Sequence, residues 1–229
     1  MTEFVLVHGT TQSPAGWGRL AAELRVHDDQ VTTIDLAAGQ PDWTVTDYAR
    51  AAADQAGTPT SRRVLIGHSG AGVLLPAIAR ATTASAVIWL AAYVPDLTGG
   101  LGMLADIQAH REAMFHSDWL GVDPTGDPEL ARRFLFHDCD PDTQRWALGT
   151  LRLFSPGAPV YQHAYQNDQP SPTAVTWACI VPAGDRTLRA EWMREAARQR
   201  LGAEPVEINA GHCPHVSQPA ALARLLARI

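Results

Sequence analysis

The sequence contains no lysine, and its 18 basic residues are all arginine. Chemistry that needs a lysine amine is therefore excluded, which removes Schiff-base and pyridoxal-phosphate catalysis and the phosphate-binding lysine of nucleotide triphosphatases. The net charge is −6 and no long basic cluster occurs, so we expect no nucleic-acid partner. The partner we expect is a small-molecule substrate, and the sequence leaves the oligomeric state open.

Cysteine is scarce. Cys139, Cys179 and Cys213 are the three in 229 residues, and they form no CxxC or other paired spacing. We expect reduced thiols, as in a reducing compartment. Two stretches rich in metal-binding residue types, 137–140 and 212–215, lack the repeated pairing of structural zinc sites, so no metal is expected.

Long hydrophobic runs are absent as well, since no apolar stretch approaches the ~18 residues that a membrane span requires. Met1 is followed by a polar pair and then by apolar residues, with no basic segment or cleavage site, so no signal peptide is expected. These features predict a cytoplasmic protein that does not engage a membrane.

Short apolar runs rich in branched residues alternate with helical patterns along most of the chain. This alternation is typical of a parallel sheet covered by helices on both faces. We expect strands over residues 3–8, 30–36, 63–67, 85–93, 176–182 and 205–209. Helices are expected over residues 15–25, 45–56, 70–81 and 218–229. The predicted fold class is α/β, with a doubly wound, mostly parallel six-stranded sheet.

Residues 99–173 break the alternation, because they contain no convincing strand but eight of the sixteen aromatic residues. We expect a helical lid there, inserted into an α/β core made of residues 1–98 and 174–229. Lid aromatics such as Trp119 and Trp146 are expected to give an apolar wall to a substrate pocket. The alternative is that these rings form the lid's own small core.

The most informative segment is Gly67-His68-Ser69-Gly70-Ala71, which joins an apolar strand to a helix without an intervening loop. Small residues on both sides of Ser69 allow the strand and the helix to approach closely, and so sharp a turn strains the serine backbone. The hydroxyl then projects at a helix N-terminus, where the N–H of Gly70 can meet developing negative charge. The alternative is a glycine-rich helix cap with Ser69 as its N-cap.

An acid and a histidine follow the serine, each on a loop directly after a predicted strand. Asp185 follows the strand over 176–182, and His212 follows the strand over 205–209. The carboxyl edge of a parallel sheet would bring both beside Ser69. In such a trio the histidine removes the serine proton and the acid fixes the imidazole tautomer. Asp96, just after the fourth predicted strand, is a rival acid, and His215 is a rival base that we assign to the pocket or its surroundings.

These motifs identify a resemblance that covers nearly all of the chain. With Phe4-Val5-Leu6-Val7-His8-Gly9, Pro182-Ala183-Gly184-Asp185 and Gly211-His212, the serine elbow resembles the α/β-hydrolase superfamily. Within it, the chain is similar to the small cofactor-free branch that contains plant-type methyl esterases and hydroxynitrile lyases. Ala71 replaces the final glycine of the familiar elbow, and alanine is small enough to serve there.

The resemblance also implies how the site is completed. It places the backbone N–H of Thr10 opposite that of Gly70, as the second donor of an oxyanion hole. Gly9, Thr11 and His215 are then expected near the substrate, together with the two lid tryptophans, and no cofactor is expected.

The reaction that we expect is cleavage of a carboxylic ester, thioester or lactone of a small apolar substrate through an acyl-enzyme, as in a carboxylesterase-like serine hydrolase. Similar hydroxynitrile lyases carry a threonine after the first-strand histidine and a lysine after the catalytic histidine. Gly9 and Cys213 stand at those positions, so cyanohydrin cleavage is disfavoured. Two alternatives stay open, namely a non-hydrolytic ligand-binding or receptor-like protein and a biosynthetic enzyme that releases or cyclises an acyl chain.

Overall fold

The computed structural model describes residues 1–36, 41–166 and 175–229. Within them six strands form one sheet, in which every neighbouring pair is parallel. Their spatial order is β2 (Gln30–Ile34), β1 (Thr2–Val7), β3 (Arg62–His68), β4 (Ala86–Leu90), β5 (Thr176–Pro182) and β6 (Val206–Ile208). The predicted fold class is confirmed, with a sheet that is wholly parallel. Since β2 and β3 lie on opposite sides of β1, the carboxyl ends of β1 and β3 form a topological switch point, where such sheets bind ligands.

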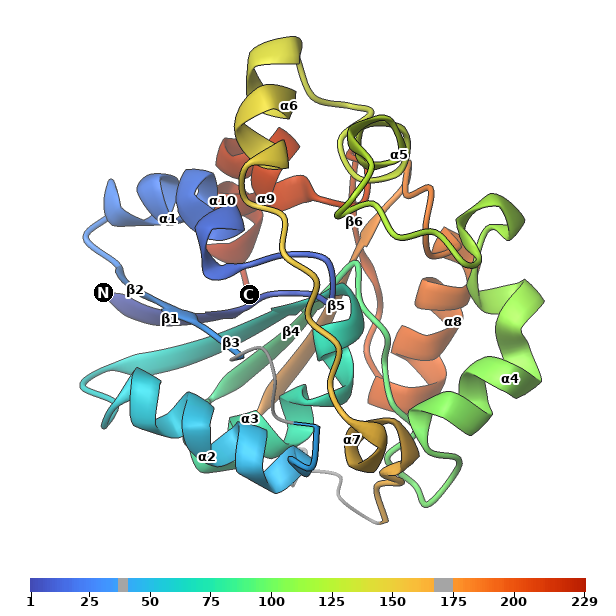
Figure 1. Ribbon diagram of the computed structural model, residues 1–229. Coiled ribbons are helices and arrows are strands. Elements are labelled where there is room, and N and C mark those ends of the chain that lie inside the picture. The colour runs from blue at the N-terminus through green and yellow to red at the C-terminus, as the bar shows by residue number, and fades with distance from the viewer. Residues whose placement is uncertain (37–40, 167–174) are drawn as a thin grey trace.

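Helices cover both faces of the sheet, as Figure 1 shows. The side chains of β1 alternate between two cores, with Phe4 and Leu6 in one and Val5 and Val7 in the other. Because successive side chains of a strand point to opposite faces, a sheet covered twice needs apolar residues at every position. The first core is completed by α1 (Gly18–Arg25) and α10 (Pro219–Leu226), and the second by α2 (Val45–Ala56), α3 (Leu75–Ala81) and α8 (Ala190–Leu201).

Between β4 and β5 the chain forms α4 (Met103–Met114), α5 (Pro128–Phe134), α6 (Pro141–Leu148) and α7 (Ala158–Gln162). Figure 1 shows these helices spread around the sheet, with α5 and α6 at the top, α4 at the right and α7 at the bottom. The predicted boundary between lid and core at residues 173 and 174 lies outside the described residues. No helix in the described ranges combines the length and the hydropathy of a membrane span.

Several predicted element boundaries are wrong, each for a local reason. The helix predicted over 70–81 begins as a 3-10 helix over Ser69–Val73 before α3 continues it. The helix predicted over 218–229 is α10, which ends at Leu226. A short helix that was not predicted, α9 (Pro214–Ser217), precedes it, and Pro219 disfavours a helical backbone at Gln218 between the two. The fourth strand ends at Leu90, since Ala91 has a φ of 47°.

Candidate active site

The serine elbow positions Ser69 through close backbone packing. Ser69 has a φ of 55°, a conformation that costs a non-glycine residue about 1–3 kcal/mol. The neighbouring segments can approach this turn only because the glycines of the turn have no side chain. A Cβ on Gly72 would lie 1.8 Å from the carbonyl oxygen of Tyr93, and one on Gly67 would lie 2.4 Å from Leu75. The packing therefore fixes the serine at the carboxyl end of β3, between strand and helix.

Ser69, His212 and Asp185 meet in a chain of hydrogen bonds. The distance from Ser69 Oγ to His212 Nε2 is 3.1 Å, and the distance from His212 Nδ1 to Asp185 Oδ2 is 2.8 Å. The side chains of His212 and Asp185 are 1% and 0% exposed. Because an ionised carboxylate can only accept, Nδ1 carries the imidazole proton and Nε2 is left as the acceptor for the serine hydroxyl. This arrangement suits removal of the serine proton.

The loops that carry the acid and the base are held by further contacts. Oδ1 of Asp185 accepts the backbone N–H groups of Thr187 at 2.7 Å and Leu188 at 3.2 Å. The backbone carbonyl of His212 accepts from Nε2 of His68 at 2.8 Å. Burial holds the pKa of His68 well below its usual value, so this ring stays neutral and keeps its structural hydrogen bond. The rival acid Asp96 instead accepts from Thr98 on its own loop.

Thr187 is a member of this cluster that sequence reasoning missed. Its hydroxyl lies 2.9 Å from Nδ1 of His212 and 3.0 Å from Oδ1 of Asp185. The hydroxyl can donate to the carboxylate and accept from the imidazole, so it bridges both partners. The available signal was a threonine two residues after the acid, in a spacing that commonly forms a local side-chain turn.

Replacing Thr187 by valine is expected to lower kcat for ester hydrolysis about 10-fold, because a hydrogen bond to a charged group contributes about 1.5–3 kcal/mol. Thr187→Ser keeps the hydroxyl and is expected to stay within about threefold of the wild-type kcat. Steady-state kinetics and melting temperatures of both variants test this. Near-normal activity in Thr187→Val together with a loss of activity in Thr187→Ser would show that the methyl group, and not the hydroxyl, is what matters.

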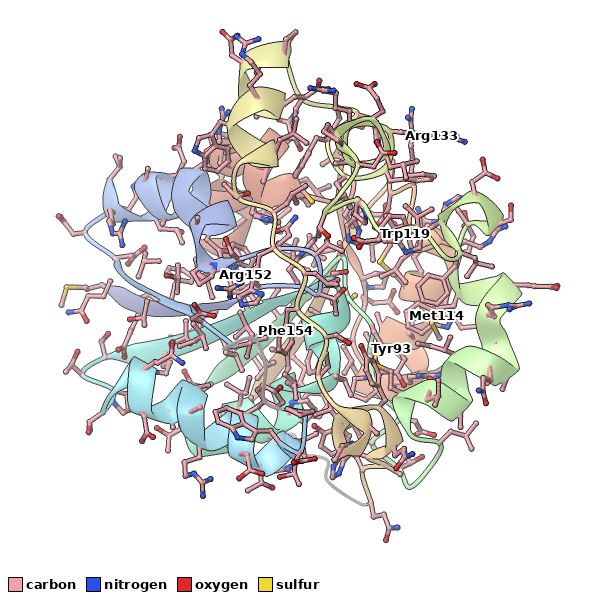
Figure 2. The ribbon with its side chains drawn as sticks, in the orientation of Figure 1. Tyr93, Met114, Trp119, Arg133, Arg152 and Phe154 are labelled. Carbon is pink, nitrogen blue, oxygen red and sulfur yellow. The ribbon has the colours of Figure 1, made fainter. Side chains whose placement is uncertain are left out.

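Beside Ser69 lies a pocket of about 320 Å³. Five aromatic residues contribute to its wall, and three of them, Tyr93, Trp119 and Phe154, are labelled in Figure 2. Among the described residues that line it, Asp123 is the only charged one. The other lining residues come from the segments directly after β1, β3 and β5 and from the segment between β4 and β5: Thr10, Thr11, Gly70, Met103, Ile107, Phe115, Val122, Leu153, Ser155, Tyr161, Thr187 and Leu188.

The structure brings several predicted site residues together at this pocket. Thr10, Thr11, Gly70 and Trp119 line it. Gly70 and Thr10 lie against each other, since a Cβ on Gly70 would be 2.7 Å from Thr10 Cγ2. A Cβ on Gly9 would lie 2.8 Å from Cβ of Ser69, so Gly9 is next to the serine although it does not line the pocket.

Two residues that we expected near the substrate, His215 and Trp146, do not line this pocket. His215 is fully buried behind the site, where Nε2 contacts Gln12 at 2.9 Å and the ring packs on Trp17. Burial lowers the pKa of His215 to about 3. Trp146 on α6 is 38% exposed and lies near Gly18 of α1, because α6 packs toward α9 and away from the pocket.

In residues 1–36, 41–166 and 175–229, no group of three or more histidine, cysteine or acidic side chains is arranged so that it could hold a metal ion. The thiol of Cys213, next to the candidate base, is buried and lies 3.0 Å from Nε2 of Gln12. Burial raises the pKa of this thiol well above its usual value, so it is unsuited to nucleophilic chemistry.

A family model described as the alpha/beta hydrolase family matches residues 4–225, which is nearly the whole chain. The chain therefore belongs to the alpha/beta hydrolase family.

Solved structures share the fold at low sequence identity. Polyneuridine aldehyde esterase matches with a TM-score of 0.80 and 21% identity, covering 100% of this chain and 98% of that one. A methylesterase protein from Arabidopsis matches with a TM-score of 0.73 and 19% identity over 100% and 98% of the two chains. A pyrethroid hydrolase from Sphingobium faniae matches with a TM-score of 0.75 and 17% identity, covering 99% of this chain and 96% of that one. No curated protein matched the sequence.

Proposed function

We propose that this protein is a serine hydrolase that cleaves an ester-like bond of a small, uncharged, apolar substrate. The observation that carries the proposal is the hydrogen-bonded chain from Ser69 through His212 to Asp185 beside an apolar pocket. The names of the structural neighbours include polyneuridine aldehyde esterase, a methylesterase and a pyrethroid hydrolase, which supports ester chemistry on this fold.

In the proposed reaction, Ser69 Oγ attacks the carbonyl carbon while its proton passes to Nε2 of His212. The carbonyl oxygen becomes negatively charged and accepts the backbone N–H groups of Thr10 and Gly70. The carbon–oxygen bond to the leaving group then breaks, and His212 delivers the proton to the departing alcohol. Water repeats the sequence on the acyl-enzyme, which releases the acid and restores Ser69.

The lyase alternative receives no support from the residues around Ser69. The threonine that the similar lyases carry would occupy the position of Gly9, where a Cβ would already lie 2.8 Å from the serine Cβ. The position of their lysine is occupied by Cys213, which is 0% exposed. A lysine ammonium at such a buried position would have to be desolvated or the loop would have to move.

The pocket wall predicts a preference for neutral substrates. Since Asp123 is the only charged side chain among the described lining residues, a substrate carboxylate would be desolvated without a cationic partner. We expect kcat/KM for 4-nitrophenyl butyrate to exceed that for 4-nitrophenyl hydrogen succinate by about 100-fold, because an unpaired buried charge costs several kcal/mol.

The experiment measures both esters with wild type, Asp123→Asn and Ser69→Ala. Asp123→Asn is expected to reduce the ratio of kcat/KM between the two esters, because it removes the repulsion between Asp123 and the succinate carboxylate. Ser69→Ala is expected to abolish turnover of both esters. Equal kcat/KM values for the two esters in the wild type would contradict the proposed substrate class. Binding of the butyrate ester without any turnover would favour the receptor-like alternative.

A further inference from the structure

The orientation of the peptide group between Gly9 and Thr10 is held by hydrogen bonds to the Gly9 carbonyl oxygen. The carbonyl oxygen of Gly9 lies 2.9 Å from Nδ1 of His8 and accepts the N–H of Gln12 at 3.3 Å. In a trans peptide the N–H points opposite to the carbonyl. The Thr10 N–H therefore points away from His8 and Gln12, and Thr10 itself lines the pocket beside Ser69.

One tautomer of His8 contributes to the orientation of this peptide, together with the Gln12 N–H. Nε2 of His8 accepts the backbone N–H of Leu36 at 3.2 Å, and a backbone N–H can only donate. The proton of the neutral ring must therefore be on Nδ1, which donates it to the Gly9 carbonyl. Burial lowers the pKa of His8, and the charge of Arg152 acts in the same direction, so the ring stays neutral.

Arg152 approaches the same imidazole from the lid. Its Nη2 lies 3.4 Å from Nε2 of His8, and the guanidinium forms a bidentate ion pair with Asp35, the residue that follows β2. Asp35 lies only 3.8 Å from Nε2 of His8. Without Arg152 this carboxylate would favour a proton on Nε2, and the neutral ring would then lose its donor to the Gly9 carbonyl.

The backbone around Arg152 is attached to the same loop. Arg152 N–H donates to the Thr11 carbonyl at 3.3 Å, and Phe154 N–H donates to the Thr10 carbonyl at 2.6 Å. Leu151 forms an antiparallel bridge with Gln12. Figure 2 shows Arg152 and Phe154 on the segment between α6 and α7 that crosses in front of the sheet.

We propose that Arg152 is a positioning residue for the oxyanion hole: by holding Asp35 and facing Nε2 of His8, it keeps the proton of His8 on Nδ1 and thereby directs the Thr10 N–H into the pocket. The oxyanion donor is thus set by a lid residue on the other side of the loop. This role rests on the proposed function, because it matters only if negative charge develops next to Thr10.

Two variants test the role of Arg152. Arg152→Met removes the guanidinium and keeps an apolar side chain of similar reach. Arg145→Met is the matched control, since Arg145 is in the same lid and its ion pair with Asp142 is exposed and remote from the loop. We expect Arg152→Met to lower kcat about 10-fold with KM within about twofold. Loss of a whole oxyanion donor costs about 100- to 1,000-fold in kcat, and this variant misorients the Thr10 N–H without removing it. The control is expected to match the wild type.

A second readout does not depend on activity. The amide resonance of Thr10, followed in ¹⁵N-threonine-labelled protein, is expected to shift in Arg152→Met and to stay in place in Arg145→Met. If Arg152→Met does not fold, Arg152→Lys should shift the same resonance in the same direction by less. An unmoved Thr10 resonance in a folded variant would overturn the role of Arg152 whether or not the protein is active. Absence of ester turnover in the wild type would instead overturn the proposed function.

Discussion

Replacing Ser69 by alanine is expected to lower kcat for 4-nitrophenyl butyrate by about 10⁴-fold or more, which is about 5.5 kcal/mol of lost transition-state stabilisation. The change removes the attacking oxygen but leaves the pocket and both backbone donors in place. We expect the melting temperature to change little, because the elbow is held by backbone packing around Gly67 and Gly72 that alanine does not disturb.

The measurement compares kcat and thermal unfolding of the wild type and Ser69→Ala under the same conditions. A folded variant that retains near-normal turnover would contradict a nucleophilic role for Ser69. Loss of activity together with a large drop in melting temperature would point to a structural role for the hydroxyl.

Replacing Asp185 by asparagine is expected to lower kcat by about 10⁴-fold through the wrong imidazole tautomer. Oδ1 of Asp185 accepts two backbone N–H groups, from Thr187 and Leu188, so the amide oxygen of an asparagine must occupy that place. The amide NH₂ would then face Nδ1 of His212 as a donor. The imidazole proton would move to Nε2, where it faces Ser69 and prevents that nitrogen from accepting the serine proton.

Asp96→Asn is the matched control for this prediction, since Asp96 is the rival acid in the sequence and accepts hydrogen bonds from Thr98 of its own loop. We expect its kcat to remain within about twofold of the wild-type value, as for surface substitutions in general. A large loss in Asp96→Asn with normal activity in Asp185→Asn would contradict the account and move the acid to Asp96.

The sheet was predictable because its requirements are local and repetitive. Two covered faces favour apolar residues at successive strand positions, and Phe4–Val7 of β1 and Val64–Ile66 of β3 meet that demand. The association of Ser69, Asp185 and His212 was predictable for a related reason, since each follows a strand and parallel strands end at one edge. Strand ends therefore carry information about the candidate site that the rest of the sequence does not.

The remaining parts of the site depend on contacts between distant segments. Trp146 and Trp119 both lie between β4 and β5, yet of the two Trp119 lines the pocket and Trp146 does not, because α6 packs against α9. His215 follows His212 by three residues but is directed into the core, against Trp17. Arg152 meets Asp35 across 117 residues, and no local pattern marks that pairing.

The most direct test of the central claim is to find the covalent acyl-enzyme. The protein is mixed with 4-nitrophenyl butyrate, quenched in acid during turnover and digested with trypsin. Since the chain has no lysine, cleavage after arginine releases residues 64–80 as one peptide, in which Ser69 is the only serine. The account predicts a butyryl group on that peptide in the wild type and none in Ser69→Ala. Turnover that proceeds with the acyl group on another peptide, or unchanged in Ser69→Ala, would contradict it.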